Sequence, residues 1–385
     1  MNTIKNKDIF RKIMLIIEES CNLECTYCYE HHKTNSKMTF NTAKRCIDNE
    51  MKLFDKNNII EIEFIGGEAF LAFDLIKQIV EYVDEKYYNW NIHYICTTNG
   101  TLIHGEIQKW IEKHKNFFCS LSLDGTKSMH DINRPFRNSN KGSFDSIDLD
   151  FFLKNWNDIN AKMTISPETL PHMVEGIKFI EELGFTCSAT FATGIDWTNE
   201  NNIKVLIEQL EYLVDYYKNN PDRKLCQLLA IDLCSVFVEK NDTIRYCGAG
   251  IKMHAYDVNG NQYPCQGFAP ITLGKEANKY IKCNFENIRL PEETPCRNCI
   301  FLHICPDCYS SNKASTGNES LQSKEMCVFN RLCILASAKI QYIRLIKKEI
   351  QNFTIEDQKT LKAISIIQKE IFNKNNVFLY NDIII

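Results

Sequence analysis

The strongest constraint on the fold is an alternation of short β-rich runs with longer stretches of helical periodicity over residues 12–221. The short runs are rich in β-branched and aromatic residues, and the stretches between them carry apolar residues at helical spacing. Such an alternation predicts parallel strands joined by crossover helices, which is the α/β class. The expected strands are residues 13–17, 60–65, 92–97, 117–123, 162–165 and 185–191, and the expected helices are 42–54, 71–87, 106–114, 144–155 and 170–183.

Length and charge limit the number of domains and the kinds of partner. A chain of 385 residues is more typical of two domains than of one. We expect a long helix over 201–219 and the turn at 219–222 to end the first domain. The net charge of −4, from 45 basic and 49 acidic residues, provides no basic stripe for nucleic acid. No apolar stretch approaches the roughly 20 residues of a membrane span, so we predict a cytoplasmic protein without a nucleic-acid or membrane partner.

The chain contains 18 cysteines, which in a reducing compartment are better candidates for metal ligands than for disulfides. Three of them, Cys21, Cys25 and Cys28, follow the first expected strand in the spacing Cys-x3-Cys-x2-Cys. Thiolates are suited to iron–sulfur clusters, and three of them hold three irons of a cubane while the fourth iron stays open for chemistry. The alternatives are a partial zinc site and buried small residues.

A second group of cysteines occupies residues 247–327. The pair Asn259-Gly260, flanked by β-rich residues, predicts a two-residue hairpin that brings Cys247 and Cys265 together. Two Cys-x2-Cys pairs separated by a short spacer follow, and such pairs could also form a closed zinc site. In chain order, the cysteines of this second group are Cys247, Cys265, Cys296, Cys299, Cys305, Cys308 and Cys327.

Further motifs identify a family. Tyr27 precedes the third cysteine of the triad, Gly66-Gly67-Glu68-Ala69 follows the second strand, and Ser122-Leu123-Asp124-Gly125 follows the fourth. Together with the cysteine patterns, this succession resembles radical S-adenosylmethionine (SAM) enzymes with a C-terminal SPASM domain, as in ribosomal peptide (RiPP) maturases and, more distantly, anaerobic sulfatase maturases. The resemblance implies a partial (β/α)6 TIM-like barrel over 1–222, a small cysteine-rich SPASM domain over 223–335 and a helical C-terminal tail over 336–385.

The resemblance also implies the cofactors, which are SAM, one SAM-binding 4Fe-4S cluster and two auxiliary 4Fe-4S clusters. The triad would hold the catalytic cluster, and the motif residues would bind SAM, although Ala69 stands where the family usually has proline. The implied SAM-binding residues are Tyr27, Gly66, Gly67, Glu68, Ser122 and Arg134.

For the auxiliary clusters, the implied pairing gives Cys247, Cys265 and Cys308 to the first cluster. Its fourth ligand would be Cys234 or Cys226, or its iron would be open. The spacing of two residues between Cys305 and Cys308 departs from the family's three. The second cluster would be held by Cys296, Cys299, Cys305 and Cys327.

The implied reaction is reductive cleavage of SAM to a 5′-deoxyadenosyl radical, which abstracts hydrogen from a ribosomally synthesised peptide. The product would be a thioether, another crosslink or an epimer. Oxygen-sensitive clusters suggest an anaerobic host and a flavodoxin- or ferredoxin-type reductant. Because the first strand begins near residue 13, we expect a separate leader-recognition protein or direct leader docking.

Two other functions compete with this one. The first is an anaerobic sulfatase-type formylglycine maturase, but Gln266 stands where those enzymes place an aspartate proposed as the base. The second is a non-catalytic iron–sulfur or zinc protein, against which Tyr27 and the motifs over 122–144 argue.

Overall fold

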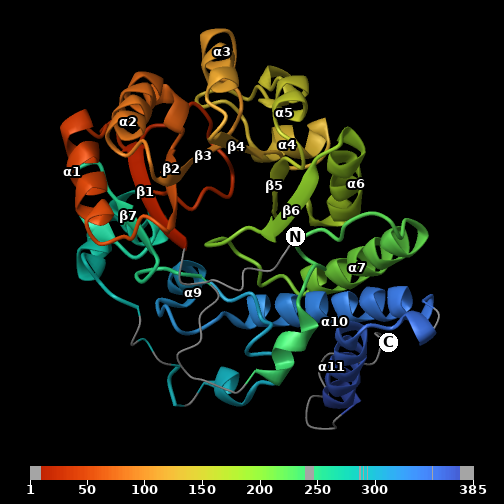
Figure 1. The fold of residues 1–385 in the computed structure, drawn as a ribbon. Helices are drawn as coiled ribbons and strands as arrows, with labels where there is room; N and C mark the ends of the chain where they lie inside the picture. The colour runs from red at the N-terminus through yellow and green to blue at the C-terminus, as the bar shows by residue number, and fades with distance from the viewer. Residues whose placement is uncertain are drawn as a thin grey trace. The chain divides into compact units, whose positions relative to one another are not determined.

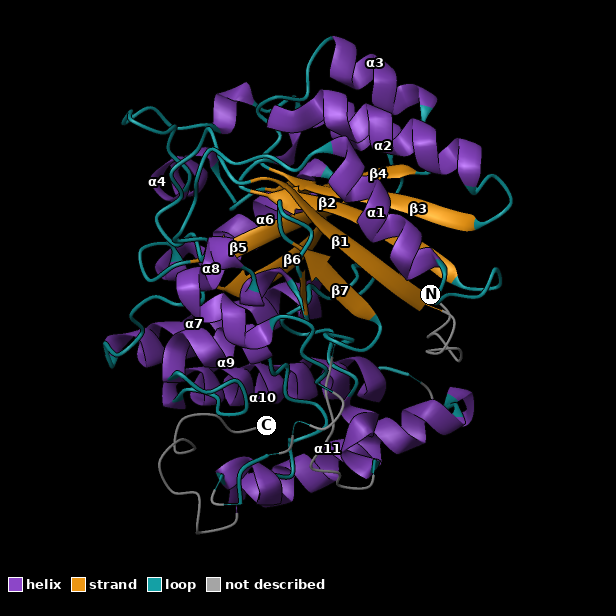
Figure 2. Cartoon of the chain, turned by 90° about the vertical axis from the view of Figure 1, so that its left-hand side faces the viewer, coloured by secondary structure: helices purple, strands orange, loops and turns teal. Residues whose placement is uncertain are grey.

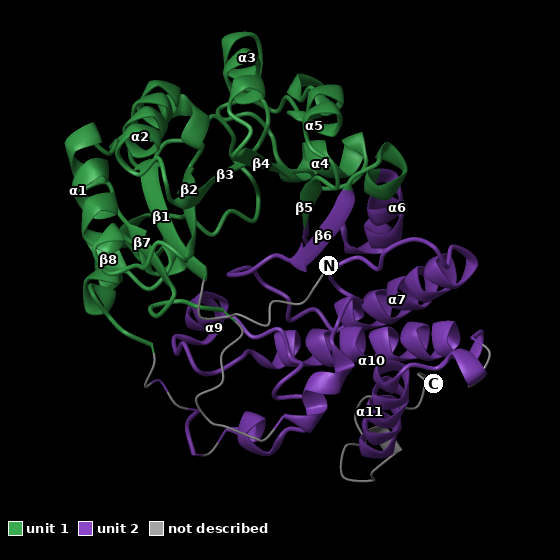
Figure 3. Cartoon of the chain, viewed as in Figure 1, with its two compact units in different colours: residues 1–163, 180–185, 247–287 green, residues 164–179, 186–246, 288–385 purple. Residues whose placement is uncertain are grey.

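The computed structural model describes residues 10–238, 247–285, 288, 290–292, 294–348 and 350–372. The chain forms two compact units, which Figure 3 shows in separate colours. Unit 1 comprises 1–163, 180–185 and 247–287, and unit 2 comprises 164–179, 186–246 and 288–385. The domain boundaries at 222 and 335 remain a proposal.

A parallel sheet forms the centre of unit 1, in agreement with the α/β prediction (Figure 1). Its first strands follow chain order in space, with β1 next to β2, β2 next to β3 and so on to β5. The five strands are β1 (Phe10–Glu18), β2 (Ile59–Gly66), β3 (Asn91–Thr98), β4 (Phe117–Ser122) and β5 (Asn160–Ile165), whose last two residues belong to unit 2. The intervening helices are α1 (Phe40–Met51), η1 (Ala69–Ala72), α2 (Phe73–Lys86), α3 (Glu106–Lys113), α4 (Lys127–Asn133), η2 (Phe144–Ser146) and α5 (Leu149–Asn155).

The two faces of this sheet differ in chemistry. On the helix-covered face, Phe64, Tyr94 and Phe117 stack on neighbouring strands, and Phe70 of η1 and Trp110 of α3 pack against Phe117. On the opposite face, the alternate positions of the same strands are mixed, because polar residues lie there beside Met14, Ile95 and Phe118. The polar positions are Lys12, Glu61, Glu63, His93, Thr97, Ser120 and Lys162. The period of two therefore separates the aromatic core from a face that carries most of the polar strand residues.

The predicted hairpin forms and extends the sheet of unit 1, but its loop spans residues 257–261 and not the predicted two residues. β7 (Met253–Tyr256) pairs in parallel with β1 on the side away from β2, and β8 (Gln262–Tyr263) pairs antiparallel with β7 (Figure 2). Gly260 has a φ of +84°, which a glycine adopts without strain. The Asp257 carboxylate accepts the backbone N–H groups of Asn259 and Asn261, both at 2.9 Å. The turn is therefore fixed by its own residues.

Unit 2 is mostly helical. Its long helices α7 (Asn201–Asn219) and α10 (Lys324–Ile346) pack against each other, and α10 also contacts α11 (Ile355–Phe372). Buried Leu335, Ala338 and Ile364 belong to the core shared by α10 and α11. The remaining elements that lie wholly in this unit are η3 (Leu170–His172), β6 (Thr186–Phe191), η4 (Leu233–Phe237), η7 (Pro295–Asn298), α9 (Tyr309–Thr316) and η8 (Ile350–Asn352). Helix α6 (Met173–Leu183) has residues in both units. Unit 1 also contains η5 (Gln266–Phe268), α8 (Pro270–Leu273) and η6 (Gly274–Tyr280).

The sequence placed most of these elements correctly, and α7 has the predicted bounds. Three predicted helices are each divided into a 3-10 turn and an α-helix. The predicted helix 71–87 spans parts of η1 and α2, and 170–183 spans η3 and α6. The helix predicted over 144–155 is divided into η2 and α5, because the Asp148 side chain accepts the Phe151 N–H and starts a new helix. Within the described ranges, no helix is both long enough and apolar enough to cross a membrane.

Candidate active site

The three cysteines of the N-terminal triad lie on the loop between β1 and α1, at the carboxyl end of β1. Cys21 is buried, and Cys25 and Cys28 are half-buried. The Cys28 N–H donates to the Cys25 carbonyl at 3.1 Å, which forms a tight turn between these two residues. Elsewhere the loop is fixed by backbone bonds from Glu24 to Pro135 and from Thr26 to Asn133, both at 2.9 Å. The loop is therefore held against the segment that follows α4.

The thiols of this loop suit an iron–sulfur cluster. Burial raises the pKa of the Cys21 thiol to about 12 and that of Cys25 to about 11, so each needs a compensating positive charge to become a thiolate. A metal supplies that charge. No three His, Cys, Asp or Glu side chains of the described residues converge as a site for one ion. A cubane does not require such convergence, because each thiolate binds a different iron.

Gly66 and Gly67 connect the end of β2 to this loop. The Gly67 N–H donates to the Glu18 carbonyl at 2.9 Å, and the Glu68 N–H donates to the Ser20 carbonyl at 3.0 Å. A Cβ on Gly66 would lie 1.9 Å from the Glu18 oxygen, and one on Gly67 would lie 2.2 Å from the Ser20 oxygen. Both glycines are thus required by the backbone that leads into Cys21.

The Glu68 carboxylate connects the end of β3 to the turn that leads to the cysteine loop. It is buried and accepts the Asn99 N–H at 2.8 Å, the Thr98 hydroxyl at 2.9 Å and the Phe70 N–H at 3.1 Å. The Asn99 side chain in turn donates to the side-chain oxygen (Oδ1) of Asn22 at 2.9 Å, and Asn22 lies between the first two cysteines. The ends of β1, β2 and β3 therefore form one hydrogen-bonded network.

Arg134 and Tyr27 meet at a carboxylate to which the sequence analysis gave no role. Asp124 is fully buried and accepts from Arg134 Nε at 3.0 Å, from Arg134 Nη2 at 3.2 Å and from the Tyr27 hydroxyl. Arg134 Nη1 reaches the Cys25 sulfur at 3.9 Å. The predicted Ser122 is buried two residues before Asp124, at the end of β4. The position directly after a strand was the available signal for Asp124.

His130 supports this network in its neutral form. Burial lowers the pKa of His130 to about 4. The Ser143 hydroxyl donates its proton to the Arg134 carbonyl at 2.6 Å, so His130 Nε2 donates to Ser143 Oγ at 3.1 Å. His130 Nδ1 then accepts the Asp124 N–H at 3.3 Å. The ring therefore carries its proton on Nε2 and orients both Asp124 and the backbone of Arg134.

The hairpin brings two further predicted ligands toward this region of unit 1. The Gly250 N–H donates to the Pro264 carbonyl at 3.0 Å, so the turn after Cys247 lies beside the residue that precedes Cys265. Gln266 and Cys265 both lie close enough to affect the pKa of Tyr29, which directly follows Cys28. Gln266 is thus next to the cysteine loop.

The second set of cysteines lies in unit 2. The pKa of the Cys305 thiol is raised, first by burial and then by the neighbouring Asp307 and the thiols of Cys327, Cys299 and Cys296. Four predicted ligands are therefore close neighbours. Arg331 Nη2 and Asn330 Nδ2 donate toward the sulfurs of Cys299 and Cys305 at 3.8 and 3.7 Å.

The other cysteines of the prediction lie elsewhere in unit 2. Cys308 is exposed at the start of α9, with its sulfur 3.3 Å from the Ser310 hydroxyl. The Cys234 sulfur lies 3.5 Å from the Thr360 hydroxyl of α11, and Cys226 is buried near Cys333. Each of the two candidates for the fourth ligand, Cys234 and Cys226, thus has a partner within unit 2.

Comparison with known proteins agrees with this geometry. A family described as a 4Fe-4S single cluster domain matches residues 11–142. A cysteine-type anaerobic sulfatase-maturating enzyme of Clostridium novyi is 25% identical over 76% of this chain and 86% of its own. The radical SAM cyclopropyl synthase TigE of Paramaledivibacter caminithermalis is 24% identical over 56% of this chain and 49% of its own. The chain is thus similar to radical SAM enzymes, in sequence over part of its length and in fold over most of it.

Other matches define the extent of the similarity. An uncharacterized protein of Methanocaldococcus jannaschii is 35% identical, but the match spans 46% of this chain and 60% of that protein. Among solved structures, anSMEcpe with bound AdoMet has a TM-score of 0.68 at 19% identity, covering 88% of this chain and 100% of that one. Streptococcus suis SuiB bound to its precursor peptide SuiA has a TM-score of 0.58 at 17% identity, covering 83% and 76%. These structures confirm the predicted fold. The 4Fe-4S family match and the relatives agree with the predicted enzyme class and cofactors.

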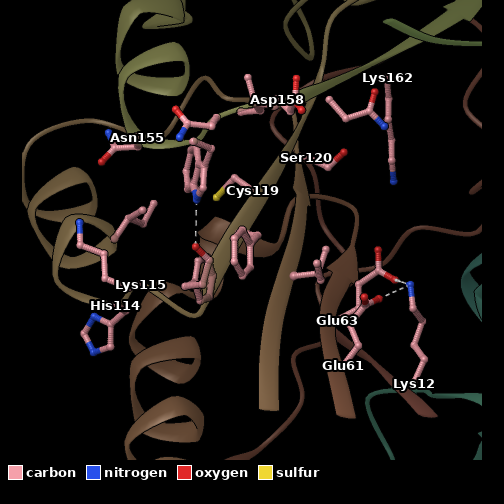
Figure 4. A pocket seen from close by; sticks show the side chains of 18 residues that line it. Lys12, Glu61, Glu63, His114, Lys115, Cys119, Ser120, Asn155, Asp158 and Lys162 are labelled. Carbon is pink, nitrogen blue, oxygen red and sulfur yellow. Dashed lines mark hydrogen bonds and ion pairs between the residues drawn. The ribbon is translucent and has the colours of Figure 1, made fainter. Parts of the chain in front are cut away.

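The chain also has a cavity of about 610 Å³ in unit 1, near the amino ends of the strands (Figure 4). On its wall, the Lys12 ammonium pairs with the carboxylates of Glu61 and Glu63, the latter at 3.1 Å. Thr97 donates to Glu63 at 3.2 Å and accepts from Lys162 at 2.9 Å, which links β1, β2, β3 and β5 by side chains. The cavity is therefore lined by charged residues on one side and by apolar residues such as Ile95, Phe118 and Trp156 elsewhere. The predicted cysteine ligands and SAM-binding residues do not line it.

Proposed function

We propose that this chain is a radical SAM enzyme that modifies a ribosomally synthesised peptide. The observation that carries the proposal is the meeting of four motifs at the carboxyl ends of β1 to β4. The cysteine loop, the Gly66–Gly67–Glu68 turn, Asn99 and the Asp124–Arg134 pair are joined there by hydrogen bonds. In α/β barrels this edge is where active sites are built.

For the cofactors, we propose that Cys21, Cys25 and Cys28 hold the catalytic cluster. When bound, the cluster and SAM supply reductive cleavage of SAM, which provides the 5′-deoxyadenosyl radical for hydrogen abstraction. Gly66, Gly67 and Glu68 would shape the SAM site, with Tyr27, Ser122 and Arg134 beside it. Arg134 is oriented for this role by Asp124, which holds two of its three guanidinium nitrogens.

For the auxiliary clusters, we propose the same division as the resemblance implies. The proximity of the thiols of Cys296, Cys299, Cys305 and Cys327 supports a four-ligand cluster in unit 2. Cys247, Cys265 and Cys308 would hold the other. Because Cys234 contacts Thr360 and Cys226 lies beside Cys333, an open iron is favoured over either as the fourth ligand.

The proposed substrate is a peptide, and its modification is a thioether, another crosslink or an epimer. The fold similarity to SuiB, whose structure contains its precursor peptide, supports a peptide substrate. The competing function is formylglycine formation on a sulfatase, which the similarity to the Clostridium novyi enzyme favours. Gln266 decides between them in our proposal, because its amide cannot accept a proton as an aspartate does.

The proposal is tested by SAM cleavage in anaerobically reconstituted enzyme. Wild-type protein should form 5′-deoxyadenosine, and Cys25→Ala should abolish it because the site-differentiated cluster cannot assemble. Cys46→Ala, at a buried cysteine of α1 outside the motif, is the matched control and should retain cleavage. Cleavage by Cys25→Ala at the wild-type rate would show that the assignment is wrong.

A second measurement distinguishes the two substrates. A precursor peptide encoded near this gene, deuterated at the target carbon, should transfer deuterium to 5′-deoxyadenosine. The peptide should then be lighter by two hydrogens or be an epimer of unchanged mass. Efficient formylglycine formation on a sulfatase peptide, with no change in the precursor, would instead establish the maturase function.

A further inference from the structure

A lysine side chain lies directly on one sulfur of the cysteine loop. The Lys33 ammonium is 2.7 Å from the Cys28 sulfur and also donates to the Glu30 carbonyl at 2.9 Å. Its side chain is 17% exposed, so the contact is largely shielded from water. The Glu30 carboxylate is farther away, with its nearer oxygen 3.8 Å from the ammonium. The thiol of Cys28 is therefore the closest partner of this cation.

The two cations that reach thiols of this loop, within the described part of the chain, differ in how their charge is used. Arg134 lies 3.9 Å from the Cys25 sulfur, and its charge is balanced by the two-point contact with buried Asp124. Lys33 has no comparably close carboxylate among the contacts of its ammonium, because the Glu30 oxygen is 1.1 Å farther away than the Cys28 sulfur, from distances of 3.8 and 2.7 Å. Its charge therefore acts mainly on the cluster ligand.

We propose that Lys33 raises the reduction potential of the cluster held by Cys21, Cys25 and Cys28, by donating a charge-assisted hydrogen bond to the Cys28 thiolate. Cluster potentials depend on net charge, on hydrogen bonds to the sulfurs and on solvent exposure. Reduction adds one electron from an external reductant to the oxidised cluster, so its negative charge grows by one with no bond made or broken. A nearby ammonium stabilises the reduced form more than the oxidised form. Lys33 is thus a positioning and tuning residue and does not contact substrate.

The inference depends on the proposed cluster site, and the same loop offers a matched control. Lys37 lies four residues later, but its ammonium pairs with the Glu18 carboxylate at 2.8 Å and is 55% exposed. Lys33→Met removes the charge and the hydrogen bond, whereas Lys37→Met removes an equal charge that does not touch a thiol. Lys33→Arg retains a cationic donor.

The test is a potentiometric titration of the holoenzyme, followed by electron paramagnetic resonance. The signal that changes shape when SAM is added identifies the loop cluster among the others. We expect Lys33→Met to lower its midpoint potential, Lys37→Met to leave it unchanged and Lys33→Arg to restore it. With limiting reductant, Lys33→Met should also slow 5′-deoxyadenosine formation, and this loss should disappear in excess reductant.

An unchanged midpoint in Lys33→Met, at wild-type iron content, would overturn the inference. If Lys33→Met does not retain the cluster, Lys33→Gln, which keeps a neutral donor, replaces it, and the same lowering or its absence decides the question. A wild-type protein without a SAM-sensitive signal would instead refute the proposed function. The two failures are therefore distinguishable.

Discussion

The buried pair of Asp124 and Arg134 allows a quantitative test of the site. Asp124 is fully buried and accepts from both Arg134 nitrogens, the Tyr27 hydroxyl and Asn133 Nδ2 at 3.2 Å. Asp124→Asn keeps the shape of the side chain but replaces one carboxylate oxygen, a hydrogen-bond acceptor, with an NH2 donor that faces the guanidinium. Arg134, at 8% exposure, is left without its counter-charge. Breaking a buried pair in this way costs about 3–5 kcal/mol.

This cost can be measured locally by hydrogen exchange of the segment from β4 to the end of α4. At about 1.4 kcal/mol for each tenfold change, the most protected amides there should exchange roughly 10²–10⁴-fold faster in Asp124→Asn. Asp74→Asn is the matched control, because Asp74 is 86% exposed and its pair with Lys77 at 2.7 Å is worth about 0–1 kcal/mol. Its exchange should remain within about fivefold of wild type.

A double variant separates the charge effect from simple loss of packing. In Asp124→Asn combined with Arg134→Met, the unbalanced charge is gone, so the total cost should be smaller than the sum of the two single costs. Additive costs, or an Asp124→Asn protein that exchanges like Asp74→Asn, would refute our description of a desolvated pair that holds Arg134 on Cys25.

Three further predictions concern pH, backbone and metal content. His130 has a pKa lowered by burial to about 4, below its ordinary 6.5, so the unfolded state binds more protons between these values. About 3 kcal/mol of stability should therefore be present above pH 6.5 and be lost as the pH falls to 4, and a His130→Gln protein should show a flatter urea-unfolding profile over that range. Gly67→Ala would place a Cβ 2.2 Å from the Ser20 oxygen and should prevent cluster loading, measured as iron content. Gly317→Ala, at a left-handed position where a Cβ has no neighbour within 4 Å, should cost only about 1–2 kcal/mol of backbone strain and load normally. Reconstituted protein should contain roughly 12 iron atoms in three 4Fe-4S clusters, and Cys299→Ala should lose about 4 of them while still cleaving SAM; stoichiometric zinc with about four irons would contradict the two auxiliary clusters.

The sequence by itself determined the features that are local in the chain. The alternation of β-rich runs with stretches of helical periodicity located the strands, because such patterns are properties of consecutive residues. The triad of Cys21, Cys25 and Cys28 was visible because all its members lie on one loop. Gly260 marked the hairpin for the same reason, since its conformation depends on its immediate neighbours.

Tertiary structure decided what depends on residues far apart in the chain. Asp124 lies 97 residues after Tyr27, so only the pairing of parallel strands shows that it binds both Tyr27 and Arg134. The parallel pairing of β7 with β1 joins residues more than 200 positions apart, which no local pattern encodes. Even the short-range contact of Lys33 with Cys28 required the folded loop, because a spacing of five residues does not fix where a flexible side chain points. Burial gives these contacts their chemical effect, since it removes the water that would otherwise screen their charges.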